Sequence, residues 1–164
     1  MVRDRLWTFL LALVGVGVIV LLALQIGLIT PPWAEDSADV RVVDGDTGDE
    51  LAVVDVEVAD TPSERYTGLS DHEDLPEGDG MLFVHSNEDE RTYVMREMDF
   101  DIDIIFIDSD REITTIEHAR APEPGEDGED LEYTGQAQYV LEVPRGYANE
   151  TGMDVGDEVE IEYE

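Results

Sequence analysis

The stretch from Gly80 to Asp108 constrains the fold of this chain more than any other part of it. It contains three strand-like runs, at residues 81–85, 91–97 and 102–108, and turn-forming residues separate the first two. Runs this short, rich in β-branched and aromatic residues, are typical of strands rather than helices. The last run is almost continuously apolar, which predicts a central strand buried on both faces. The stretch therefore indicates a mainly β domain.

Strand-like patterns recur on both sides of this stretch. They cover residues 39–43, 51–58, 112–119, 131–134, 136–143 and 157–163. Only two short helices are expected, one after the capping-box sequence Thr61-Pro62-Ser63-Glu64 and one within residues 144–151. No helical pattern is long enough to connect parallel strands. The fold class we expect is a compact β-sandwich or partly closed barrel of about eight or nine short strands.

An apolar segment precedes this domain. Residues 6–29 are almost wholly apolar, which is longer than the roughly 20 residues that a helix needs to cross a bilayer. A cleaved signal peptide has a shorter apolar region, so we expect an uncleaved signal anchor over residues 1–30. Arg3 and Arg5 would hold the N-terminus in the cytoplasm. The membrane is then a partner of the chain, residues 31–37 form a linker, and residues 38–164 form an extracytoplasmic domain.

The acidic excess of the chain limits its partners. The net charge is −33, with 42 acidic residues against nine basic ones, and every basic residue is Arg. The acids occur within strand-like patterns, which argues against disorder. The composition is similar to that of haloarchaeal proteins, since molar salt shortens the Debye length to about 3 Å and screens such charge. An acidic partner-binding surface in ordinary salt is the alternative, and nucleic acid is excluded as a partner.

Six short motifs occur in order between about Val54 and Ile161. They are Arg65 with Gly68-Leu69, Gly80-Met81-Leu82-Phe83, Met95-Arg96, Asp103 within Asp103-Ile104-Ile105-Phe106, Tyr139-Val140-Leu141-Glu142 with Gly146, and Gly156-Asp157. In this order they resemble the family known as domain of unknown function 192 (DUF192). The chain departs from the family pattern at Val94, Glu97-Met98 and Asp101-Ile102, where the family has Trp, Asn-Thr and Pro-Leu. The resemblance implies a mostly β fold that often follows a signal or anchor segment, and it implies no particular reaction.

Four charged residues in these motifs are candidate ligand-binding residues: Arg65, Arg96, Asp103 and Glu142. Asp103 and Glu142 share strand faces with apolar residues, so both are expected to be buried. A buried carboxylate must be paired or hydrogen-bonded. We therefore expect Arg65 or Arg96 to pair with Asp103 or Glu142 in a partly buried polar cluster. Such a cluster could fasten the short helix to the sheet, or it could form a ligand pocket.

Apolar residues near these motifs could line such a pocket. The candidates are Met81, Phe83 and Met95, although residues of these types are also common in plain hydrophobic cores. The three histidines, His72, His85 and His118, lack the spacing of a metal site. We assign no catalytic residue, no metal ligand and no cofactor from the sequence.

Three classes of function remain open. The leading one is a membrane-anchored, extracytoplasmic domain that binds a small ligand or an envelope partner. The second is a hydrolytic enzyme, with or without a metal. The third is a structural envelope protein without a discrete site.

Overall fold

The computed structural model describes residues 37–164. The anchor expected at residues 1–30, and the linker as far as residue 36, lie outside the described residues. None of the helices in residues 37–164 is both long enough and apolar enough to span a bilayer.

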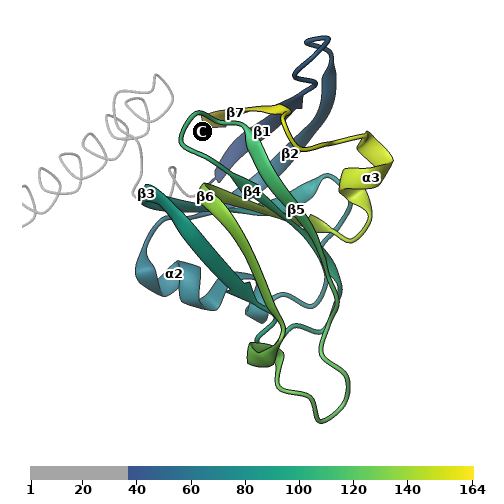
Figure 1. Ribbon diagram of the computed structural model, residues 1–164. Helices are drawn as coiled ribbons and strands as arrows, with labels where there is room; N and C mark the ends of the chain where they lie inside the picture. Colours follow the sequence, from purple (N-terminus) through teal and green to yellow (C-terminus); the bar gives the residue numbers. More distant parts are fainter. Residues whose placement is uncertain (1–36) are drawn as a thin grey trace, which may run out of the picture. The chain divides into compact units, whose positions relative to one another are not determined.

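The described residues form a mainly β domain with one mixed sheet (Figure 1). Its strands are β1 (Ser37–Val43), β2 (Glu50–Ala59), β3 (Asp79–Val94), β4 (Ile102–Ile107), β5 (Ile113–Ala119), β6 (Glu132–Pro144) and β7 (Glu158–Tyr163). Its helices are α2 (Pro62–Thr67) and α3 (Tyr147–Thr151), with single turns of 3-10 helix at η1 (Gly68–Asp71) and η2 (Gly128–Asp130). The strand order is β5-β4-β6-β3-β2-β1-β7. Only β2 and β3 are parallel among these neighbouring pairs.

The sheet has seven strands rather than eight or nine because two pairs of expected strands are continuous. The run at 81–85 and the first part of the run expected at 91–97 both belong to β3, which ends at Val94. The expected turn between them is an irregularity in the pairing of β3 with β6, between Val84 and Asp89. The runs at 131–134 and 136–143 merge into β6 across Gly135. A Cβ at Gly135 would lie 2.4 Å from the ring of Phe106. This glycine therefore permits a close approach of the two strands and does not end one of them.

The mainly β class expected from the sequence is confirmed, but the strands do not form the expected sandwich or barrel. The sheet is not divided into two sheets, and it is not closed into a barrel. The two edge strands of the sheet are β5 and β7, and they approach each other where Glu112 and Glu158 form an isolated bridge. The irregularity within β3 is of the kind that increases the local twist of a strand.

A parallel connection that the sequence did not predict joins β2 to β3. Residues 60–78 form it, and α2 with η1 is its only helical part. The expected capping box begins α2: the Thr61 side chain accepts a hydrogen bond from the Glu64 amide, and the Glu64 carboxylate accepts one from the Thr61 amide. So short a helix suffices because the two parallel strands are direct neighbours.

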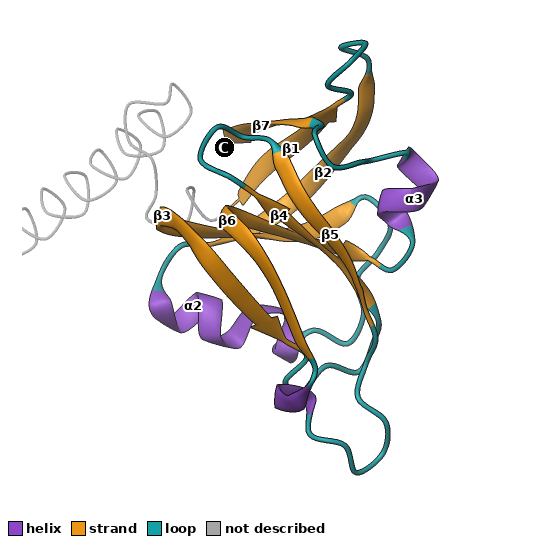
Figure 2. Cartoon of the chain, viewed as in Figure 1, coloured by secondary structure: helices purple, strands orange, loops and turns teal. Residues whose placement is uncertain are grey.

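The hydrophobic core has one cluster on each face of the sheet. Leu69 of η1 packs in the first cluster with, among others, Phe83, Met95, Met98, Ile102 and Phe106. Tyr147 and Ala148 of α3 pack in the second with, among others, Val40, Val54, Leu82, Ile105 and Ile107. The helices α2 and α3 accordingly lie on different sides of the strands (Figure 2). All of β4 is buried, as its apolar sequence predicts, although it is the neighbour of an edge strand rather than the centre of the sheet.

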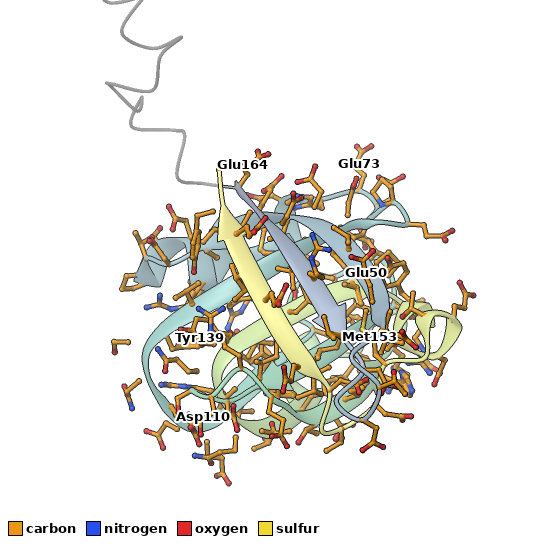
Figure 3. The ribbon with its side chains drawn as sticks, turned by 90° about the horizontal axis from the view of Figure 1, so that it is seen from above. Glu50, Glu73, Asp110, Tyr139, Met153 and Glu164 are labelled. Carbon is orange, nitrogen blue, oxygen red and sulfur yellow. The ribbon has the colours of Figure 1, made fainter. Side chains whose placement is uncertain are left out.

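The acidic residues are mostly at the surface. Figure 3 shows Glu73, Asp110 and Glu164 at the periphery of the domain, and all three are exposed. Three acidic side chains among the described residues are buried instead: Asp103, Glu142 and Asp157. These three are the ones whose environments can indicate a function.

Candidate functional site

Asp103 and Glu142 do not meet, because they lie on opposite faces of the sheet. In the pairing of β4 with β6, Asp103 is opposite Val143, whereas Glu142 is opposite Ile104. Successive side chains of a strand point to opposite faces. Asp103 therefore faces α3, and Glu142 faces α2 and η1. The single four-residue cluster expected from the sequence is divided between the two faces.

Asp103 is a buried carboxylate with partners at both oxygens. Its Oδ2 accepts hydrogen bonds from the amides of Gly146, at 2.9 Å, and Ala148, at 3.1 Å. Its Oδ1 lies 2.6 Å from Nδ1 of His118 and 3.8 Å from Nε of Arg145. These contacts fasten the beginning of α3 to β4. Asp103 therefore fastens a short helix to the sheet, which is one of the two roles considered from the sequence. The helix is α3, whereas the sequence analysis considered the helix that begins after Thr61.

Glu142 is buried without such partners. Its exposed fraction is 5%, and its carboxyl group makes no hydrogen bond or ion pair with any residue in 37–164. Burial raises the pKa of Glu142 to about 8. The cause is the loss of water around the charged form, which no donor or cation among the described residues offsets.

The Glu142 side chain lines a cavity of about 240 Å³ between the sheet and the α2–η1 segment. Apolar walls come from Leu69, Phe83, Met98 and Ile102. Polar walls come from Arg65, Tyr66, His85, Tyr93 and Arg96. The site therefore combines an apolar lining with a few convergent polar groups, as small-molecule sites do.

Gly68 positions the α2–η1 segment over the cavity. It follows α2 with a positive φ of 49°, and a Cβ at this position would lie 3.2 Å from the ring of Phe83. Glycine adopts this conformation without strain and lets the backbone approach the ring. The next residue, Leu69, enters the core. The Gly-Leu motif noted in the sequence thus has a packing role at the roof of the cavity.

Arg65 is held by backbone carbonyls rather than by an acid. Its Nη1 donates to the carbonyl oxygen of Asp60 and, at 2.8 Å, to that of Val84. Within residues 37–164 its guanidinium forms no ion pair. The expected pairing of Arg65 with Asp103 or Glu142 is therefore wrong.

Arg96 lies at the rim of the same cavity and is engaged by other groups. Its Nε lies 2.5 Å from Oε1 of Glu129, and its guanidinium stacks 4.2 Å from the centre of the Tyr66 ring. Its Nη1 donates to the Tyr66 carbonyl oxygen at 3.3 Å. Ser70 Oγ donates to the Arg96 carbonyl oxygen at 2.9 Å. Arg96 therefore links η2 to the α2–η1 segment, and it does not pair with either buried acid.

His85 and Tyr93 form a neutral pair in the wall of the cavity. Nε2 of His85 lies 2.9 Å from the Tyr93 hydroxyl. Burial, with the nearby charges of Arg91 and Arg65, lowers the pKa of His85 to about 4. Burial and the charge of Glu142 raise the pKa of Tyr93 above its ordinary value. Neither group changes its charge near neutral pH, so Glu142 is the group of this wall that titrates there.

Only some of the site residues expected from the sequence therefore line this cavity. The cavity brings together Arg65, Arg96, Glu142 and Phe83, whereas Asp103 lies on the other face of the sheet. Met81 lines a neighbouring pocket, and Met95 is fully buried in the core.

Sequence reasoning missed His85 and Tyr93. In a regular strand two residues eight apart would be about 27 Å from each other. The irregularity between Val84 and Asp89 brings them together, because residues 85–88 of β3 lie opposite a single residue of β6.

The histidines are dispersed. His72 lies 3.6 Å from Glu57, His85 contacts Tyr93, and His118 contacts Asp103. In the part of the chain that the structure describes, no group of three metal-ligating side chains comes together.

The fold and the site define a class: a single mixed β-sheet with short helices on its faces and, under one of them, a small cavity with an apolar lining and a few polar groups. The chain belongs to the DUF192 family, described as "Uncharacterized ACR", whose model matches residues 43–161. This confirms the resemblance seen in the sequence motifs.

Two crystal structures are similar to the chain. One is of a protein from Sinorhizobium meliloti described as a candidate transcription regulator, with 26% identity, a TM-score of 0.69, and coverage of 78% of this chain and 95% of that one. The other is of a protein of unknown function from Novosphingobium aromaticivorans, with 29% identity, a TM-score of 0.65, and coverage of 80% and 99%. No curated protein matches the chain significantly.

Proposed function

We propose that this domain binds a small molecule in the cavity beneath α2 and η1, with Glu142 as the central binding residue. The observation that carries the proposal is the unpartnered carboxyl group of Glu142, which is 5% exposed and lines the cavity. A ligand in the cavity that donates to this carboxyl group would supply the hydrogen bond that no described residue provides.

Glu142 differs from the other two buried acids of the described residues, because both of those have hydrogen-bond partners. Asp103 accepts from two amides and contacts His118. Asp157 accepts from the amides of Gly45, at 3.1 Å, and Asp154, at 2.7 Å. Both acids thus hold loops or helix ends in place. Glu142 has no comparable structural task among the described residues, which supports a role in binding.

A small ligand fits the site better than an envelope protein does. The distinctive acid lies inside a cavity and not on an exposed surface, so a partner must present a group small enough to enter. The regulator description of the Sinorhizobium meliloti protein is not carried over to this chain, because a net charge of −33 opposes contact with phosphates.

The proposal places the domain outside the cell membrane. The support is the apolar segment at residues 6–29 with Arg3 and Arg5 before it. The acidic composition supports a setting of high salt. The domain would then sample small molecules on the outer side of the membrane.

A fragment screen by isothermal titration calorimetry tests the proposal. The full-length chain, Glu142→Leu and the surface variant Glu73→Gln are titrated with the same amines, acids, zwitterions and neutral polar fragments in molar KCl. We expect at least one fragment to bind the wild type and Glu73→Gln but not Glu142→Leu. Binding that Glu142→Leu retains, or no binding by any fragment, would overturn the proposal.

A further inference from the structure

Glu142 and Arg65 line the same cavity, and each lacks an ionic partner within residues 37–164. They also make no hydrogen bond or ion pair with each other. Arg91 and Arg111 also form no ion pair among the described residues, but neither of them lines this cavity. The cavity therefore has a carboxyl group and a guanidinium in its wall, and the two remain separate.

The fold holds these two groups apart. Both hydrogens of Arg65 Nη1 are taken by the carbonyl oxygens of Asp60 and Val84. Glu142 comes from β6, where Met81 of β3 and Ile104 of β4 are its cross-strand neighbours. Arg65 cannot move toward Glu142 without breaking its hydrogen bonds to the two carbonyl oxygens.

The free edge of Arg65 suits a carboxylate. A guanidinium has five N–H donors, and the Nε and Nη2 groups form a fork that matches a carboxylate in two parallel hydrogen bonds. These two nitrogens of Arg65 make no hydrogen bond with any residue that the structure describes. The other arginine of the cavity, Arg96, already has its Nε bound to Glu129.

We infer that the ligand is a small zwitterion, whose ammonium group binds Glu142 and whose carboxylate binds Arg65. The inference rests on the proposed function and names the ligand class for the same cavity. Beside its two charged groups the ligand carries an apolar part, which lies against Leu69, Phe83 and Met98.

A zwitterion fits better than a molecule with one charge. A simple anion would leave Glu142 without a partner, and the acidic chain would repel it. A simple cation would leave the free edge of Arg65 unused. A zwitterion has no net charge, so it enters the acidic domain without repulsion and satisfies both groups at once.

Calorimetric titration of the full-length chain in molar KCl tests the ligand class. The probes are the common L-amino acids and glycine betaine, together with isoamylamine and isocaproate, which are leucine without its carboxylate and without its ammonium group. The variants are Glu142→Gln and Arg65→Gln, and Arg111→Gln is the control. Arg111 stacks on Tyr139, which packs in the other core cluster.

We expect at least one zwitterion to bind wild type and Arg111→Gln equally, and both half-molecules to bind at least about tenfold more weakly. Glu142→Gln and Arg65→Gln should each weaken the zwitterion by about tenfold or more. Arg65 also binds two backbone carbonyl oxygens, so its replacement affects the fold as well as the site. If Arg65→Gln does not fold, the binding measured with Glu142→Gln tests the inference alone.

Two other outcomes overturn the inference, and they can be distinguished. If isoamylamine, isocaproate or a neutral fragment binds at least as tightly as every zwitterion and is lost in Glu142→Gln, the zwitterion is wrong but the proposed binding function stands. If no probe binds, and the broader fragment screen is also negative, both are overturned.

Discussion

Asp103 and Glu142 lie on adjacent strands of one sheet and face opposite sides of it, the first with partners at both oxygens and the second with none among the described residues. One sheet thus contains a buried acid that fastens a helix and a buried acid that lines a cavity. The difference between them predicts opposite responses to substitution and to pH.

The stability of the wild type should fall as pH rises between about 4.5 and about 8, relative to Glu142→Gln. Burial raises the pKa of Glu142 from 4.5 to about 8. Between these values the folded state holds a proton that the unfolded state has lost, so deprotonation favours unfolding. The slope should approach about 1.4 kcal/mol per pH unit. Urea unfolding of both proteins at several pH values measures it, and parallel curves would contradict the assigned burial.

Asp103→Asn should lower the free energy of unfolding by about 1–3 kcal/mol near neutral pH. The amide nitrogen cannot accept hydrogen bonds, so either the amides of Gly146 and Ala148 or the contact with His118 loses its acceptor. Asp110→Asn, at an exposed turn, is the control and should change stability by less than about 0.5 kcal/mol. Equal effects of the two substitutions, measured by urea unfolding, would show that Asp103 does not fasten α3.

Binding of a zwitterion at pH 7 should release nearly one proton per ligand. At that pH a carboxyl group with a pKa of about 8 is mostly protonated, and pairing with an ammonium group requires its ionised form. His85, whose pKa is about 4, and Tyr93, whose pKa is raised, do not contribute. Titration calorimetry in buffers of different ionisation enthalpy counts the protons, and Glu142→Gln should release none. A binding enthalpy that does not depend on the buffer would exclude this role of Glu142.

The domain should be more stable in molar KCl than in dilute buffer. The net charge of −33 repels itself over a Debye length of about 10 Å at 0.1 M salt, and over only about 3 Å at 1 M. Thermal unfolding followed by circular dichroism from low to molar KCl measures the effect. A melting temperature that does not rise with salt would argue for an acidic partner-binding surface in ordinary salt.

Local patterns predicted much of the fold. The alternation in β2, the capping box of α2 and the apolar run of β4 each depend on neighbours in the sequence, and all three are present. The strand count was too high because the residues between Val84 and Asp89, and Gly135, have the composition of turns. Their actual roles, an irregularity and a close approach to Phe106, depend on partners distant in the sequence.

The site was predictable only in part, for the same reason. Burial of Asp103 and Glu142 followed from their apolar neighbours on each strand, and both are buried. Their separation depends on the register between β4 and β6, which pairs Asp103 with Val143 and Ile104 with Glu142. No local pattern contains that register, so two acids on opposite faces were assigned to one cluster.

The free energy of unfolding of Glu142→Leu, measured by urea at pH 9, tests most directly the claim that Glu142 serves a ligand rather than the fold. Replacing an uncompensated buried charge by an apolar side chain should raise that free energy by about 1–4 kcal/mol. A decrease of about 1 kcal/mol or more, comparable to the loss expected for Asp103→Asn, would show that the fold itself needs the Glu142 carboxyl group and would contradict the claim.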